Sequence, residues 1–93
     1  MKLEHVAGKK KGDIKLFALS TCGWCKKTKE LLNGLGVDYH YVFVDLVPDE
    51  EKEEVMNEIK KWNPDTSFPT VVLDNKKCIV GFKPDELKER LGK

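Results

Sequence analysis

Along the first half of the chain, hydrophobic residues follow a strand-like spacing, then a helix-like spacing, then a strand-like one again. The short apolar run 14–19 predicts a buried strand. Later in the sequence, four mostly apolar positions share one face of a helix: Thr28, Leu31, Leu32 and Leu35. A helix is therefore expected from about Cys22 to a capping glycine, Gly36. Residues 39–45 are mainly aromatic or β-branched and predict a second strand.

The second half of the chain predicts a helix, a hairpin and a closing helix. Residues 48–62 combine an apolar stripe with an acidic start and a basic end, an arrangement that suits the helix dipole. Two short strands, 70–73 and 77–80, flank a tight turn at 74–76 and predict a hairpin. Pro84 is tolerated in the first turn of a last helix, which continues to Leu91.

The resulting order is β-α-β-α-β-β-α. A parallel βαβ unit followed by an antiparallel hairpin predicts an α/β fold of three layers, with a mixed four-stranded sheet between helices. The 93 residues are enough for one domain, which we expect over 13–93, after a flexible N-terminal segment, 1–12.

Charge and hydropathy limit the classes of partner. A formal net charge of +1 argues against nucleic acid or an anionic membrane as the main partner, because both select for a clustered positive excess. The apolar runs fall far short of the ~18 residues of a membrane span, and the N-terminus does not resemble a secretory signal. We therefore expect a cytoplasmic protein. Its three cysteines, an odd number, do not indicate a disulfide framework.

The most informative segment is Thr21-Cys22-Gly23-Trp24-Cys25, between the first strand and the first helix. A thiolate is the attacking form of cysteine, and a helix N-terminus favours that anion. The spacing places the second sulfur within one helical turn of the first. We therefore expect Cys22 to attack a substrate disulfide and Cys25 to displace the reduced substrate, with Trp24 as an apolar platform for the partner.

A metal site is the alternative interpretation of the cysteine pair. The further ligands available are Cys78, His40 and His5. Structural zinc sites usually combine two paired ligand clusters, whereas these residues are isolated along the chain. Cys78 is expected to be a small core residue of its strand. Redox chemistry is therefore favoured over zinc or an iron–sulfur cluster, and no metal ligand is assigned.

From Ile14 to Leu91 the sequence resembles glutaredoxin-like members of the thioredoxin superfamily. Three motifs carry the resemblance: Thr21-Cys22-Gly23-Trp24-Cys25, Phe68-Pro69-Thr70 and Gly81-Phe82-Lys83-Pro84-Asp85. It implies a thioredoxin-like fold of the glutaredoxin type, a nucleophilic Cys22, a resolving Cys25 and a cis peptide bond before Pro69. It also implies a set of substrate-binding residues: Thr21, Gly23, Trp24, Phe68, Pro69, Gly81, Phe82 and Lys83.

Within that superfamily, the segment from Gly81 to Asp85 is similar to NrdH-type redoxins, which are reduced as thioredoxins are and donate electrons to ribonucleotide reductase. Pro84 falls where a backbone N–H would meet the carboxylate of glutathione, and proline has no such donor. The resemblance therefore implies a monomer that reduces protein disulfides, with a Cys22–Cys25 disulfide and no bound cofactor. The upstream reductant is a thioredoxin reductase-like enzyme or glutathione, and a glutathione-dependent glutaredoxin is the alternative function.

Overall fold

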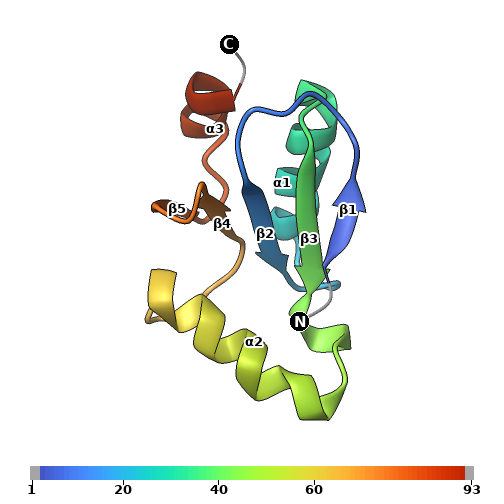
Figure 1. Cartoon of the computed structure of the whole chain (residues 1–93), viewed down its shortest axis with the longest axis vertical. Coiled ribbons are helices and arrows are strands. Elements are labelled where there is room, and N and C mark those ends of the chain that lie inside the picture. The colour runs from blue at the N-terminus through green and yellow to red at the C-terminus, as the bar shows by residue number, and fades with distance from the viewer. Residues whose placement is uncertain (1–2, 92–93) are drawn as a thin grey trace.

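A computed structural model describes residues 3–91 as a five-stranded sheet with helices on both faces. The elements are β1 (Glu4–Val6), β2 (Ile14–Ala18), α1 (Gly23–Leu35), β3 (Tyr39–Phe43), the 3₁₀ turn η1 (Val44–Leu46), α2 (Asp49–Trp62), β4 (Thr70–Leu73), β5 (Lys77–Val80) and α3 (Pro84–Leu91). The strand order is β1-β3-β2-β4-β5 (Figure 1). Only β2 and β3 run parallel, and the other neighbours are antiparallel. The three-layer α/β fold with a mixed sheet is thereby confirmed.

The sheet has one strand more than the four predicted. Strand β1 pairs with β3, and His5 Nε2 lies 2.9 Å from both carboxylate oxygens of Asp38. This hydrogen bond holds the pKa of Asp38 below its ordinary value. The backbone of Lys9 also bonds to Gly36 O and Asp38 N, each at 2.8 Å. Residues 4–9 therefore run along the sheet edge beside β3, within the part of the chain predicted as a flexible segment, 1–12. Three residues are too few to show a strand period, so only pairing with β3 defines this strand.

Two separate hydrophobic clusters hold the layers together. Strand residues alternate between the two faces of a sheet, and β2 follows this rule. Leu16 and Ala18 pack in the cluster that includes α1 and α3, whereas Phe17 packs in the cluster that includes α2. Figure 1 shows α1 behind β2 and β3. Helices α1 and α3 therefore cover one face of the sheet and α2 covers the other.

Local sequence sets most of the element ends. Gly36 ends α1 in the left-handed conformation, with φ of 68°, which glycine adopts without steric cost. The predicted second strand is too long, because Val44 and Asp45 belong to η1. Val44 still packs in the α2 cluster, so its burial gave the same apolar pattern as a strand residue.

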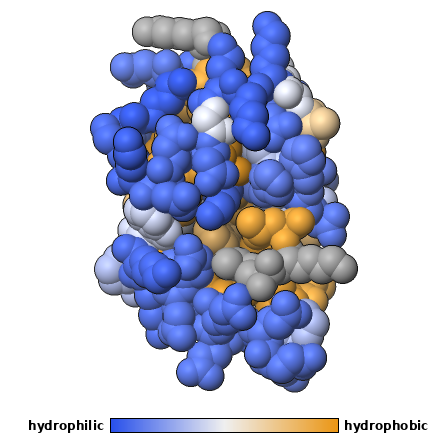
Figure 2. All heavy atoms as spheres, viewed as in Figure 1, coloured by the Kyte–Doolittle hydropathy of each residue, from blue (hydrophilic) through white to orange (hydrophobic). Residues whose placement is uncertain are grey.

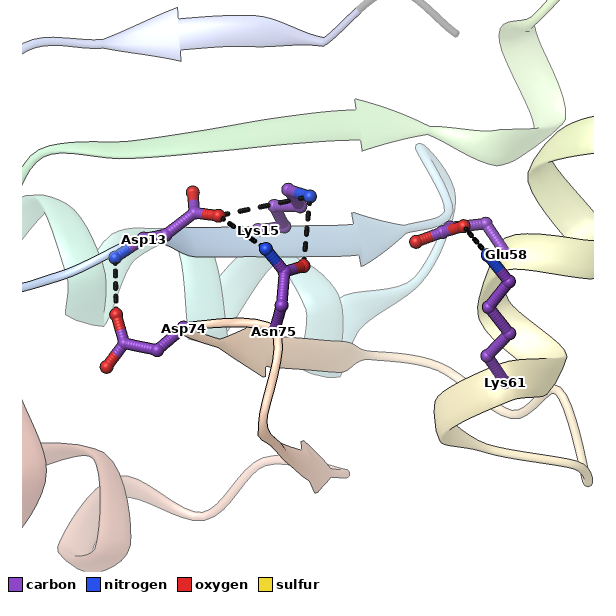
Figure 3. Close-up of polar contacts among 6 residues, drawn as sticks. All are labelled: Asp13, Lys15, Glu58, Lys61, Asp74 and Asn75. Carbon is purple, nitrogen blue, oxygen red and sulfur yellow. Dashed lines mark hydrogen bonds and ion pairs between the residues drawn. The ribbon is translucent and has the colours of Figure 1, made fainter.

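Polar contacts fix the β4–β5 turn against the start of β2 (Figure 3). The Asp13 amide donates to Asp74 Oδ1 at 2.8 Å, and Asn75 Nδ2 donates to Asp13 Oδ2 at 3.2 Å. Lys15 Nζ donates to Asn75 Oδ1 at 3.2 Å. On α2, a Glu58–Lys61 ion pair of 3.0 Å lowers the pKa of Glu58 (Figure 3). The hairpin is thus held at its turn, while its other end lies beside the end of β2.

The surface is largely polar on the face shown in Figure 2, with apolar residues mostly recessed between charged ones. None of the helices within residues 3–91 is both long enough and apolar enough to cross a membrane.

Candidate functional site

Cys22 lies at the N-terminus of α1, as the sequence predicted. It is the N-cap residue, with extended backbone angles (φ −89°, ψ 119°), and its Sγ accepts a hydrogen bond from the Cys25 amide at 3.2 Å. Its own amide donates to Leu19 O at 3.2 Å, which closes the turn after β2. The sulfur therefore replaces the usual oxygen of an N-cap and sits where the unpaired N–H groups of the helix favour an anion.

Cys25 occupies a different environment from Cys22. It is only 1% exposed and packs in the α1–α3 cluster, whereas Cys22 is partly exposed. Burial, together with a hydrogen bond that the Cys25 thiol donates to Cys22, raises the pKa of Cys25 to about 12. Cys25 therefore keeps its proton at neutral pH. The pair combines one accessible sulfur with one buried thiol a single helical turn away.

An open apolar pocket of about 200 Å³ lies next to the cysteine pair. It is lined by Trp24, Phe68, Pro69, Gly81 and Phe82. The register of β2 with β4 places Phe17 opposite Thr70, which brings the start of β4 beside the turn that follows β2. The Phe68–Pro69 peptide bond is cis, as expected, and Pro69 O accepts a hydrogen bond from the Gly81 amide at 2.8 Å.

Trp24 and Phe82 form the outer wall of this pocket. Their rings stack with centroids 5.6 Å apart, and Lys27 Nζ lies 4.9 Å from the Trp24 ring centre. Trp24 remains 59% exposed. An exposed aromatic surface beside a reactive sulfur can bury an apolar group of a bound molecule.

Not all of the predicted site residues line this pocket. Thr21, Gly23 and Lys83 are exposed and do not line the pocket, although Gly23 and Lys83 each neighbour a lining residue in sequence. Cys78 is half-buried in the α2 cluster on the other face of the sheet, where its Sγ donates to Trp62 O at 3.0 Å. His5 and His40 stack on each other, with centroids 4.5 Å apart, at the β1–β3 edge.

No metal-binding group is assembled from these residues. Within residues 3–91, no three His, Cys, Asp or Glu side chains come together in a way that could hold a metal ion. The ligands considered for the zinc alternative are instead distributed over both faces and one edge of the sheet.

Sequence reasoning missed the hydrogen bonds that anchor the turn of residues 19–22. This turn carries Cys22 and is called the redox turn below. The Ser20 amide donates to Asp45 Oδ1 at 2.8 Å, and the Ser20 hydroxyl donates to Asp45 Oδ2. These bonds lower the pKa of Asp45. They join the residue before Thr21 to η1, at the end of the neighbouring strand. The two residues are distant in sequence, so only the parallel pairing of β2 and β3 brings them together.

We expect the anchor to depend on pH in a defined direction. The lowered pKa means that the interaction is fully present above the ordinary aspartate value of 3.8 and is lost as pH falls through the lower folded value. The amide resonance of Ser20, followed by NMR, should therefore titrate with a midpoint below 3.8. Asp45→Asn should abolish this titration, and Ser20→Ala should raise the Asp45 midpoint. A wild-type midpoint at or above 3.8 would disprove the anchor.

Known proteins are similar to this chain in both sequence and architecture. The family model described as Glutaredoxin matches residues 14–79. A curated relative from Clostridium pasteurianum, an uncharacterized glutaredoxin-like 8.6 kDa protein in the rubredoxin operon, is 34% identical; the match covers 86% of this chain and 99% of that protein.

Two solved structures from Methanosarcina species are closely similar. The methanoredoxin of Methanosarcina acetivorans is 51% identical with a TM-score of 0.89, and the match covers 92% of this chain and 90% of that one. The glutaredoxin of Methanosarcina mazei Go1 is 47% identical with a TM-score of 0.90, and covers 100% of this chain and 90% of that one. The matches in sequence and in fold, together with the cysteine pair at the start of α1, indicate the same family. The chain belongs to the glutaredoxin family of thiol–disulfide oxidoreductases.

Proposed function

We propose that the protein is a dithiol electron carrier that reduces disulfides of other proteins through Cys22 and Cys25. The observation that carries this proposal is the asymmetry of the pair. Cys22 is accessible at a helix N-terminus, while Cys25 is buried, protonated and one turn behind it. That arrangement supports Cys22 as the attacking sulfur and Cys25 as the resolving one.

The cycle moves two electrons from the protein to its substrate. The Cys22 thiolate attacks one sulfur of the substrate disulfide, so that a Cys22–substrate disulfide forms and the other substrate sulfur leaves as a thiolate. Cys25 then attacks Cys22 Sγ, and its proton is transferred to the departing substrate sulfur. The Cys22–Cys25 disulfide forms, and the second substrate sulfur leaves. The substrate is reduced by two electrons, and the protein is oxidised by two.

The apolar pocket supports a protein as the substrate. Trp24, Phe68, Pro69 and Phe82 offer surface for an apolar side chain beside the scissile disulfide. Backbone groups next to Pro69 offer a bound chain a strand-like edge. Thr21, Gly23 and Lys83 border the same surface. We propose acceptors of the ribonucleotide reductase type as members of this substrate class.

The start of α3 favours a protein reductase over glutathione as the source of electrons. Pro84 is the first residue of α3 and has no N–H to donate, and Asp85 and Glu86 add negative charge to its first turn. A glutathione carboxylate would meet repulsion there. We therefore propose that a thioredoxin reductase-like enzyme regenerates the dithiol, and that the protein works as a monomer in the reducing cytoplasm. The odd number of cysteines, three, does not indicate a disulfide framework, which suits that compartment.

The test of this function is replacement of the resolving cysteine. We expect Cys25→Ser to accumulate a mixed disulfide between Cys22 and its protein substrate, because serine cannot displace the substrate sulfur. The measurement is non-reducing electrophoresis with mass spectrometry of the linked peptides, after incubation with a disulfide-containing protein. The wild-type protein should release reduced substrate and show no lasting adduct.

Two further variants make the test decisive. Cys22→Ser/Cys25→Ser should form no adduct, and Cys78→Ser should behave as the wild type. If Cys25→Ser keeps full turnover with a glutathione mixed disulfide and glutathione as reductant, the dithiol mechanism is wrong and the glutathione-dependent alternative is correct.

A further inference from the structure

A second pocket lies beside the redox turn, on the side away from Trp24. It has a volume of about 280 Å³ and is lined by Leu19, Ser20, Lys26, Lys29 and Phe43. Phe43 ends β3, whereas the apolar pocket uses Pro69 before β4 and Gly81 after β5. Because β2 lies between β3 and β4 in the sheet, the two pockets flank the turn that carries Cys22.

The second pocket is positively charged. Lys26 and Lys29 belong to α1, and neither takes part in an ion pair with a residue of the described range 3–91. The Lys29 Nζ is held 4.6 Å from the centre of the Tyr41 ring, which fixes its position at the pocket. Asp45 also reaches this side, but both of its oxygens accept hydrogen bonds from Ser20. Two cations therefore line the pocket, and the carboxylate bonded to its Ser20 is already engaged.

The charges of α1 and α2 differ in the same direction. Helix α1 carries three lysines and one glutamate, whereas α2 on the opposite face carries six acidic and three basic residues. The near-neutral total charge of the chain conceals this difference. Helix α3, on the same face as α1, carries three acidic and two basic residues, so the attraction for an acidic segment is confined to the Lys26–Lys29 side of α1, while α2 repels such a segment.

We propose that the two pockets form one docking surface for a disulfide-bearing protein segment with an acidic residue on one side of its cysteine and an apolar residue on the other. The acidic side chain occupies the Lys26–Lys29 pocket, and the apolar side chain packs against Trp24 and Phe82. This inference rests on the proposed function and adds the substrate class. The charged half contributes mainly to association rate and selectivity, since exposed charges do so more than they raise affinity.

The geometry limits the spacing of the recognised residues. The distance from β3 to β4 is two strand spacings, or about 10 Å. An extended chain advances by ~3.3 Å per residue, so about three residues separate the acidic from the apolar position, with the reactive cysteine between them. A segment with the acidic residue just before the cysteine and the apolar residue one or two positions after it fits both pockets.

The experiment uses three peptides, each joined by a disulfide to the same fluorescent reporter thiol. They differ only at the position before the cysteine, which is Asp, Asn or Lys, and all carry Leu two residues after it. The full chain is reduced in advance and used in excess, and kcat/KM for reporter release is taken from single-turnover rates at low and high salt. We expect the wild-type protein to prefer the Asp peptide to the Lys peptide by about 10-fold at low salt, and this preference should shrink as salt is added.

Matched variants locate the effect. Lys26→Glu/Lys29→Glu should abolish or reverse the preference for the Asp peptide, while Lys60→Glu/Lys88→Glu, with the same change of charge on α2 and α3, should keep it. Phe82→Ala should lower kcat/KM for the Leu peptides relative to matched Gly peptides. Because Lys26 lies near Cys22, each result is taken as a ratio between peptides, which cancels any general effect on the sulfur.

The possible failures are distinct. Equal kcat/KM for the three peptides, or an unchanged preference in Lys26→Glu/Lys29→Glu, would overturn the docking surface while reduction itself proceeds. Failure to reduce any of the peptides would instead overturn the proposed function.

Discussion

Cys22→Ser is expected to lower the rate of disulfide reduction to the uncatalysed background. The serine oxygen cannot form a disulfide with the substrate, so the first step of the cycle is lost entirely rather than slowed. Cys22 is the N-cap of α1, a position that serine also fills well, and the variant should therefore keep the fold. The measurement is turnover of a protein disulfide by the reduced protein, with circular dichroism to show that the variant is folded.

Cys78→Ser is the matched control for this loss. Cys78 lies on β5 and faces the α2 cluster, away from the redox pair. A serine hydroxyl there can donate to Trp62 O as the thiol does, at 3.0 Å in the present protein. Turnover should remain close to that of the wild type. If Cys78→Ser is inactive, or if Cys22→Ser is active, the assignment of Cys22 as the nucleophile is wrong.

Phe17→Ala should have the largest effect on stability. Phe17 is 0% exposed, lies in β2 between the two neighbouring strands, and packs in the cluster that attaches α2 to the sheet. Removal of a buried phenylalanine side chain costs about 3–5 kcal/mol, a large part of the about 5–15 kcal/mol that stabilises a typical domain. For a domain of this size, we expect the melting temperature to fall by at least about 12 °C.

Leu46→Ala provides the comparison for that change. Leu46 is also a large apolar residue close to α2, but it is 66% exposed, so its replacement should change the free energy of unfolding by no more than about 0.5 kcal/mol. Thermal denaturation of the two variants, under the same conditions, gives the contrast directly. Similar melting temperatures for both variants would mean that α2 does not cover this face of the sheet.

The two faces of the sheet contribute to different properties, one to the chemistry of the cysteine pair and the other to stability. The α1–α3 face contains Cys25 within its cluster, so packing there sets the burial that keeps Cys25 protonated. The α2 face contains Phe17 and gives stability without contributing a residue to the redox pair. Mutations of the α2 cluster should therefore act on stability more than on the chemistry of the pair.

Much of the chain could be predicted from local patterns. The helix faces, the hairpin and the glycine that ends α1 follow from spacing and turn chemistry, because each depends on residues close in sequence. The cysteine pair was predictable for the same reason. A thiol at the first turn of a helix, with a second thiol one turn on, is a property of five consecutive residues.

Tertiary structure alone decided the features that join distant segments. Strand β1 is too short to show a period and exists through its pairing with β3. Val44 and Asp45 were predicted to end a strand but lie in η1, where Asp45 accepts a hydrogen bond from Ser20. The pocket of Trp24, Pro69 and Phe82, and the cationic pocket across the redox turn, come from the strand order. Sequence spacing specifies which residues share a face of one element, whereas contacts between elements depend on how the whole sheet is assembled.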